Sequence, residues 1–294
     1  MLADSAIHFI FACESIKSPP REAPTEQARC HGGKTMRMFN QKQLCSMSQI
    51  SSQTAGIRSQ PLVRYQRIVL HIPHSSPVFP MGYEDWSKGI DEDIVRWTDW
   101  FTDWLFNSAA GTDRRIVPVS FPFSRFFCDV ERLMDDPLES LGQGIIYTDY
   151  GPNHRDISPD RMNDLREKFY IPHQERLKSW LSPSTFLIDC HSFPSDLSDV
   201  DICLGFNEDW SRPDDGILES VESVFKEQGY KVGINSPYSN SISPGIPFRY
   251  RSLMIEINKG VYMKNDIELA YAKALKVITA ISEVYSVILG KRVV

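Results

Sequence analysis

From Arg67 onward, short apolar runs rich in β-branched residues alternate with longer segments of helical periodicity. We expect strands over residues 67–72, 115–119, 125–130, 185–190, 201–206, 231–235 and 253–258. Helices are expected over residues 91–110, 160–181, 215–228 and 266–289, with an interruption of the second near Pro172. This alternation predicts an α/β fold, a single three-layer sandwich with a mainly parallel or mixed central sheet and helices on both faces.

Residues 1–60 differ from the rest of the chain. They are rich in Ser, Gln and Pro, and they lack sustained hydrophobic periodicity beyond the first dozen residues. We therefore expect a disordered or loosely ordered N-terminal extension, followed by one domain over residues 61–294.

The composition narrows the class of partner. The formal net charge is −6, which argues against nucleic acid or an anionic membrane, because both require a positive surface. No apolar run approaches the roughly 18 residues of a membrane span. The six cysteines have no short paired spacing, which is typical of reduced thiols and favours a cytoplasmic location.

Polar side chains gather where the expected strands end, and ligands of α/β sheets bind at the carboxyl ends of strands. The first run contains His71 and is followed by His74. The 185–190 run contains Asp189 and is followed by His191, and Glu256 interrupts the last run. A single such histidine is more often structural. Two histidines and a buried carboxylate together are typical of a zinc site that hydrolyses amides, in which the metal keeps a position for water.

Alternation along the strand separates the neighbours of His191. Cys190 points to the opposite face, so we expect it in the core rather than as a thiol nucleophile. Asp189 shares a face with His191 and is expected to contact the ring of His191 and to orient it toward the metal. We interpret His71, which lies within the apolar run, as a structural residue or as one that supports a metal ligand.

Five segments, in order along roughly residues 65–290, resemble motifs of the N-formylglutamate amidohydrolase family: HIPHSS, WTDWFTDWLF, SRFFCDVER, LIDCHS and LMIEINKGVYM. That family is related to zinc carboxypeptidases and zinc-dependent peptidoglycan amidases. The resemblance implies a small-molecule anionic amide as substrate. It also implies hydrolysis of N-formyl-L-glutamate to formate and glutamate by zinc-activated water.

The resemblance implies His74 and His191 as metal ligands and Glu256 as the general base. It points to Asp99 as the acidic ligand, ahead of Asp103, Asp93 and Glu92. A helix unbroken from residue 91 would turn Asp99 away from the apolar stripe, whereas a helix that begins near Thr98, a good N-cap residue, would not.

An anionic substrate needs cations. Arg125 and Arg132 match the family's Arg-Asp-Arg motif, and Arg249 lies near the Glu256 run, with Arg251 and Lys259 as further candidates. The alternative is that Arg125 and Arg132 only pair with Asp129 and Glu131.

Three other functions remain open on the sequence. One is a zinc amidase or carboxypeptidase that acts on another acyl-amino acid, a peptide or a cell-wall fragment. Another is a catalytically inactive homologue that serves as a binding module, and the third is cysteine-based chemistry through Cys190. The sequence does not indicate an oligomeric state.

Overall fold

The computed structural model describes residues 65–290, so the predicted extension over residues 1–60 lies outside the described residues. A six-stranded sheet has the order β2-β1-β5-β8-β6-β7. Its strands are β1 (Arg67–Ile72), β2 (Ile116–Ser120), β5 (Thr185–Phe193), β6 (Ile202–Gly205), β7 (Val232–Ile234) and β8 (Arg251–Asn258). The four strands β2, β1, β5 and β8 are parallel, whereas β6 pairs antiparallel with β8 and parallel with β7. The predicted mixed central sheet is confirmed.

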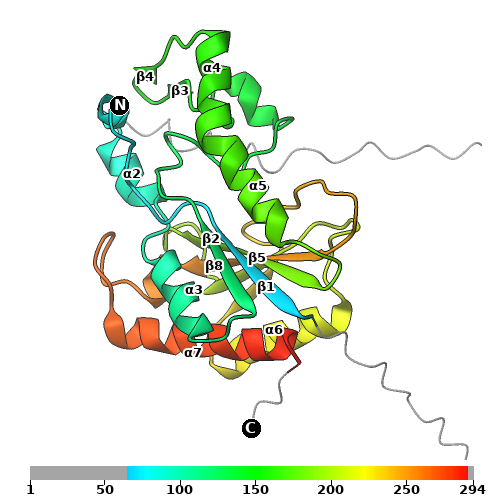
Figure 1. The fold of residues 1–294 in the computed structure, drawn as a ribbon. Helices are drawn as coiled ribbons and strands as arrows, with labels where there is room; N and C mark the ends of the chain where they lie inside the picture. Colours follow the sequence, from blue (N-terminus) through cyan, green and yellow to red (C-terminus); the bar gives the residue numbers. More distant parts are fainter. Residues whose placement is uncertain (1–64, 291–294) are drawn as a thin grey trace, which may run out of the picture. The chain divides into compact units, whose positions relative to one another are not determined.

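Helices cover both faces of this sheet, as Figure 1 shows. On one face lie α3 (Thr102–Ala110), α6 (Asp215–Glu227) and α7 (Tyr271–Ile288), and on the other lies α5 (Ile171–Trp180). Alternate residues of β1 account for the two layers: Leu70 packs with the first set, and Val69 packs with Leu177 of α5. The three-layer sandwich is therefore observed as predicted. None of the helices within residues 65–290 is long and apolar enough to cross a membrane.

The same alternation along β5 determines which face of the sheet carries its polar residues, Asp189 and His191. In β5, Ile188 and Cys190 join the core under α3, α6 and α7, so Asp189 and His191 point to the α5 side. The ladder pairs His191 with Glu256 of β8. The candidate residues of separate strands therefore meet on one face, near the carboxyl ends.

The predicted helix over residues 91–110 is two helices. α2 (Asp91–Trp97) ends at Thr98, and α3 begins only at Thr102. Phe101 has a φ of 64°, in the left-handed region, which interrupts a right-handed helix. The expected helix start near Thr98 is wrong, because Thr98 is the C-cap of α2 and has an extended conformation.

The helical stretch around Pro172 is not interrupted. α4 (Pro159–Leu165), a π-helical turn η3 (Arg166–Tyr170) and α5 follow one another directly. The π-helical turn widens the helix just before Pro172, which then sits in the first turn of α5, where a missing N–H costs little. The predicted interruption near Pro172 is therefore wrong, because the chain stays helical from residue 159 to residue 180.

The strand predicted over residues 125–130 is wrong. Residues 121–158 form turns, the short helix η2 (Pro137–Leu141) and the hairpin of β3 (Asp149–Tyr150) and β4 (Asn153–His154). Phe126 and Phe127 pack into two different aromatic clusters, so this apolar run is buried without joining a sheet. Two further short helices are η1 (Glu84–Ser87) and η4 (Lys259–Val261).

Candidate metal centre

A buried loop brings Asp99 to the end of β1. The backbone N–H of Asp99 donates to the carbonyl oxygen of His74 at 2.9 Å. The hydroxyl of Thr102 donates to the carbonyl oxygen of Asp99 at 2.8 Å. Asp99 is only 2% exposed, so the break between α2 and α3 turns this carboxylate inward instead of leaving it on a helix surface.

The imidazole of His74 has one nitrogen engaged and one free. Its Nε2 lies 2.8 Å from Oδ1 of Asp129. Its Nδ1 is buried with no hydrogen-bond partner within residues 65–290 and lies 3.8 Å from Oδ2 of Asp99. Burial, followed by the charge of Arg125, lowers the pKa of His74. A neutral ring whose Nε2–H donates to Asp129 presents a lone pair at Nδ1, as a metal ligand must.

His191 faces the same carboxylate. Its Nδ1 lies 3.1 Å from Oδ2 of Asp99, and its Nε2 lies 3.0 Å from Oδ1 of Asp189. Burial lowers the pKa of His191, but the carboxylates of Glu131, Asp189 and Asp99 outweigh burial and hold that pKa well above its usual value. An excess of carboxylates around two imidazoles is the charge pattern that attracts a cation.

Glu131 is a second carboxylate, besides Asp99, that lies close to both histidines. Ligand atoms of His74, Glu131 and His191 all lie within 4.8 Å of one another. The Glu131 oxygens are 3.7 Å from Nε2 of His74 and 3.6 Å from Nε2 of His191. Ligand atoms about 2.0–2.2 Å from a tetrahedral ion lie roughly 3.3–3.6 Å apart. This buried group of nitrogen and oxygen donors therefore fits a divalent metal ion.

Sequence reasoning missed Glu131 as a possible ligand and treated it only as an ion-pair partner of arginine. The available signal was its place in the SRFFCDVER motif, two residues after Asp129. The other predicted alternatives lie elsewhere. Asp103 and Glu92 are exposed, and Asp93 accepts a hydrogen bond from the hydroxyl of Tyr150.

Glu256 lies directly opposite His191 in the ladder between β5 and β8. Its Oε2 is buried with no hydrogen-bond partner in the described part of the chain. Burial raises the pKa of Glu256 to about 8, and a nearby cation would lower that pKa again. A carboxylate whose pKa lies close to neutral pH is suited to accept and return a proton.

A chain of buried polar groups supports His191 from behind. Oδ1 of Asp189 lies 2.8 Å from Nδ1 of His71, and Oδ2 of Asp189 accepts the N–H of Ile242 at 2.8 Å. Nε2 of His71 lies 3.1 Å from Nε2 of His173 in α5. Burial, followed by the charge of His71, lowers the pKa of His173 to about 2. His173 therefore stays neutral and lies next to His71, beyond the two supporting residues that the sequence suggested, Asp189 and His71.

The two motif arginines lie beside Asp129, and both pair with acidic residues, as the alternative interpretation of the sequence predicts. Nη2 of Arg125 lies 3.2 Å from Oδ2 of Asp129, and Nε of Arg132 lies 3.5 Å from the same atom. The Nε atoms of both arginines are nevertheless buried without a hydrogen-bond partner in the described residues. Each side chain therefore retains a donor for an anion.

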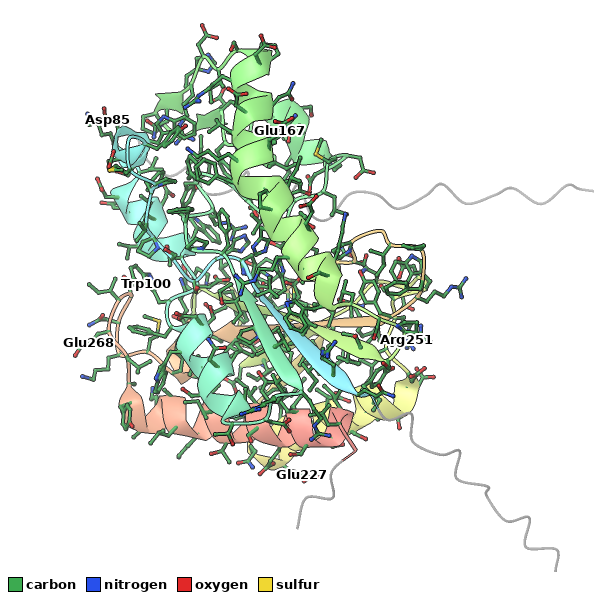
Figure 2. All side chains as sticks on the ribbon, viewed as in Figure 1. Asp85, Trp100, Glu167, Glu227, Arg251 and Glu268 are labelled. Atoms are coloured by element: carbon green, nitrogen blue, oxygen red, sulfur yellow. The ribbon has the colours of Figure 1, made fainter. Side chains whose placement is uncertain are left out.

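Arg249 is not brought to the site. It is exposed and precedes the first residue of β8, whereas Glu256 lies near the other end of that strand. In the view of Figure 2, Trp100, which follows Asp99 in the chain, lies to the left, whereas Arg251, the first residue of β8, lies to the right.

Cys190 is fully buried in the core under α3, α6 and α7, and burial raises the pKa of its thiol well above the usual value. A neutral thiol on the face opposite His191 does not match the environment of a nucleophilic cysteine. The core position expected from the sequence is observed.

Residues 66–263 match the family model described as N-formylglutamate amidohydrolase. No curated protein sequence matches this chain. The fold is similar to the crystal structure of N-formylglutamate amidohydrolase from Ralstonia eutropha JMP134. That similarity has a TM-score of 0.63 and 20% identity, and it covers 77% of this chain and 96% of the other. A gene product from Agrobacterium tumefaciens is similar with a TM-score of 0.56 and 14% identity, over 76% of this chain and 92% of the other.

Proposed function

We propose a hydrolytic function from one premise: the chain belongs to the N-formylglutamate amidohydrolase family. The reaction is hydrolysis of the N-formyl amide of an acidic amino acid, by preference N-formyl-L-glutamate, to formate and glutamate. The observation that carries this proposal is the pair of buried imidazoles, from His74 and His191, which share the carboxylate of Asp99 beside Glu256.

The ligands that we propose are Nδ1 of His74, a carboxylate oxygen of Asp99 and Nδ1 of His191. Asp129 and Asp189 lie at the opposite nitrogens of the two rings, at 2.8 Å and 3.0 Å. Such carboxylates fix the orientation of a ligating imidazole and raise its basicity. Glu131 lies near the two Nε2 atoms, which also face Asp129 and Asp189, whereas Asp99 faces both Nδ1 atoms. This is why we favour Asp99 over Glu131.

Two imidazoles and one carboxylate are donors that suit zinc, and we propose zinc as the ion. A divalent ion there supplies a Lewis acid for the scissile carbonyl and for the attacking water. We assign the proton transfers to Glu256, whose Oε2 accepts a proton from the water and passes it to the leaving nitrogen.

Arg125 and Arg132 are our candidates for the α-carboxylate of the substrate. Both guanidinium groups pair with acidic residues, Asp129, Glu131 and Asp136. The donors that remain for a substrate are their buried Nε atoms, which have no hydrogen-bond partner in the described residues. Guanidinium groups bind carboxylates through paired hydrogen bonds. The position of Arg249 gives no support to a similar role for that residue.

Glu256→Gln tests the assignment of the proton transfers. Because Gln cannot accept the proton, we expect kcat for N-formylglutamate to fall by roughly 100- to 10,000-fold. The metal content should stay at the wild-type level, because Glu256 is not a proposed ligand. Metal analysis and steady-state kinetics on the same preparations provide both values. A variant that keeps wild-type kcat would refute the role of Glu256.

A further inference from the structure

A pocket of about 110 Å³ lies beyond the carboxyl ends of β5 and β8, the two strands that carry His191 and Glu256. It is formed by the end of α2, the residues after β5 and the residues after β8, which include Arg96, Ser195, Asp196, Lys259, Gly260 and Lys264. Asp99 and Glu256 both act on the charge of Lys259. The pocket therefore opens at the same edge of the sheet as the proposed reaction centre.

Two of the cations that line this pocket already have carboxylate partners. Nη2 of Arg96 lies 2.9 Å from Oδ2 of Asp196, and Nζ of Lys264 lies 2.7 Å from Oε1 of Glu268. Lys259 differs from both, because within residues 65–290 no carboxylate lies at ion-pair distance from its Nζ. Its ammonium group donates to the carbonyl oxygen of Arg96.

Lys259 is also buried, with only 7% of its surface exposed. Burial lowers its pKa to about 8, so at neutral pH the amine remains largely protonated. An ammonium group has three donors, and one contact to a carbonyl leaves the others unused. The carboxylates that act on this charge, those of Asp99, Asp266 and Glu256, lie beyond ion-pair distance. A buried charge without a partner in direct contact is unfavourable, so an anion that enters the pocket and contacts Nζ would relieve this cost.

We propose that this pocket is a subsite for the side-chain carboxylate of the substrate, with Nζ of Lys259 as the donor that recognises it. The inference rests on the proposed function and deepens it. Arg125 and Arg132 contact Asp129 and Glu131, whereas Lys259 contacts the end of α2. The two carboxylates of an N-acyl glutamate thus have separate cationic partners. A volume of about 110 Å³ accommodates a group of a few heavy atoms.

The structural alternative is that Lys259 only ties the C-terminal end of α2 to β8 through the carbonyl oxygen of Arg96. That role predicts a loss of stability, and equal effects on substrates with and without a side-chain carboxylate. The discriminating quantity is therefore a ratio between two substrates of the same shape. N-formylglutamine replaces the side-chain carboxylate of N-formylglutamate with a neutral amide.

The test compares kcat/KM for these two substrates in the wild type, in Lys259→Met and in the control Lys226→Met. Lys226 is an exposed lysine of α6 that pairs with Glu222. In Lys259→Met we expect the ratio of N-formylglutamate to N-formylglutamine to fall roughly ten- to hundredfold, mostly through KM, as for a lost hydrogen bond to a charged group. The control should keep the wild-type ratio. A wild-type ratio in Lys259→Met overturns the proposal.

A second variant keeps the test decisive if Lys259→Met folds poorly. Ser195 is exposed and lines the pocket, so Ser195→Asp adds a negative charge without burying it. We expect this variant to weaken inhibition by glutamate but not by glutamine. Ser223→Asp, on the exposed side of α6, should weaken neither. Equal effects of Ser195→Asp on both inhibitors would contradict the subsite.

Two different results with the wild-type protein would refute the proposed function and the carboxylate subsite. A wild-type protein that hydrolyses neither N-formyl substrate in the presence of metal removes the proposed function. A wild-type protein that hydrolyses N-formylglutamate with no preference over N-formylglutamine removes only the carboxylate subsite.

Discussion

Among single residues, the nitrogen that each imidazole offers to a metal decides which carboxylate can join it. In His74, Nε2 lies 2.8 Å from Asp129, and Nδ1 has no hydrogen-bond partner in the described residues. In His191, Nδ1 lies 3.1 Å from Asp99, whereas Nε2 lies 3.0 Å from Asp189 without hydrogen-bond geometry. Our proposal uses Nδ1 of each ring, because both Nδ1 atoms face Asp99, and assigns Asp129 and Asp189 the role of orienting the rings.

This geometry predicts different results for the two acidic residues of the centre. Asp99→Asn should lower the affinity for zinc by at least about 100-fold, because it removes a charged ligand rather than an outer-shell partner. Glu131→Gln also replaces a carboxylate with an amide of the same shape, but this variant should keep about one zinc ion per chain. Titration of the metal-free proteins with zinc measures both affinities. Weak binding in Glu131→Gln together with tight binding in Asp99→Asn would assign the acidic ligand to Glu131 instead.

At the scale of elements, helix α5 is joined to strand β1 by two imidazoles. His173 contacts His71 across the interface and packs edge-on against Phe121. Because His173 is buried and neutral in the folded protein, the interface should be sensitive to acid.

The expected change of the free energy of unfolding with pH follows from the pKa values of His173 in the folded and unfolded protein. The folded protein keeps this ring neutral down to about pH 2, whereas the usual value of 6.5 applies to an exposed ring. Unfolding at acidic pH therefore takes up a proton, and the free energy of unfolding should decrease as the pH falls below 6.5. The slope from this one group approaches about 1.4 kcal/mol per pH unit.

Urea unfolding of the wild type and of His173→Gln at pH 7.5 and pH 5.5 checks this slope. Gln retains a side-chain hydrogen-bonding group but does not titrate. The wild type should lose more stability between the two pH values than the variant, by on the order of 1 kcal/mol. Equal losses in both proteins would show that His173 takes up no extra proton on unfolding.

At the scale of the whole molecule, regular apolar patterns were enough to predict most of the sheet and its helices. The run over residues 67–72 forms β1 with the predicted bounds, and the alternation in β5 separates Cys190 from His191 as expected. The two histidines and Glu256 could be found because each lies at or near the end of a strand, where the fold itself brings them together.

The remaining features come from tertiary contacts that have no local signal. The left-handed conformation of Phe101, which turns Asp99 inward, occurs at a residue type that rarely adopts it. Glu131 belongs to a turn-rich segment whose apolar residues pack into separate clusters, so periodicity could not reveal that it faces the histidines. The short motifs indicate the family, but they do not predict that Glu131 lies close to His74 and His191.

The most direct test of the central claim is the metal content of the purified protein, of His74→Ala and of His191→Ala, measured beside far-UV circular dichroism. The account predicts about one divalent ion per chain in the wild type and its loss from both variants while the folded spectrum is retained, because each variant removes one of three ligands. Folded variants that keep a full complement of metal, or a metal-free wild type that hydrolyses N-formylglutamate at the undiminished rate, would contradict it.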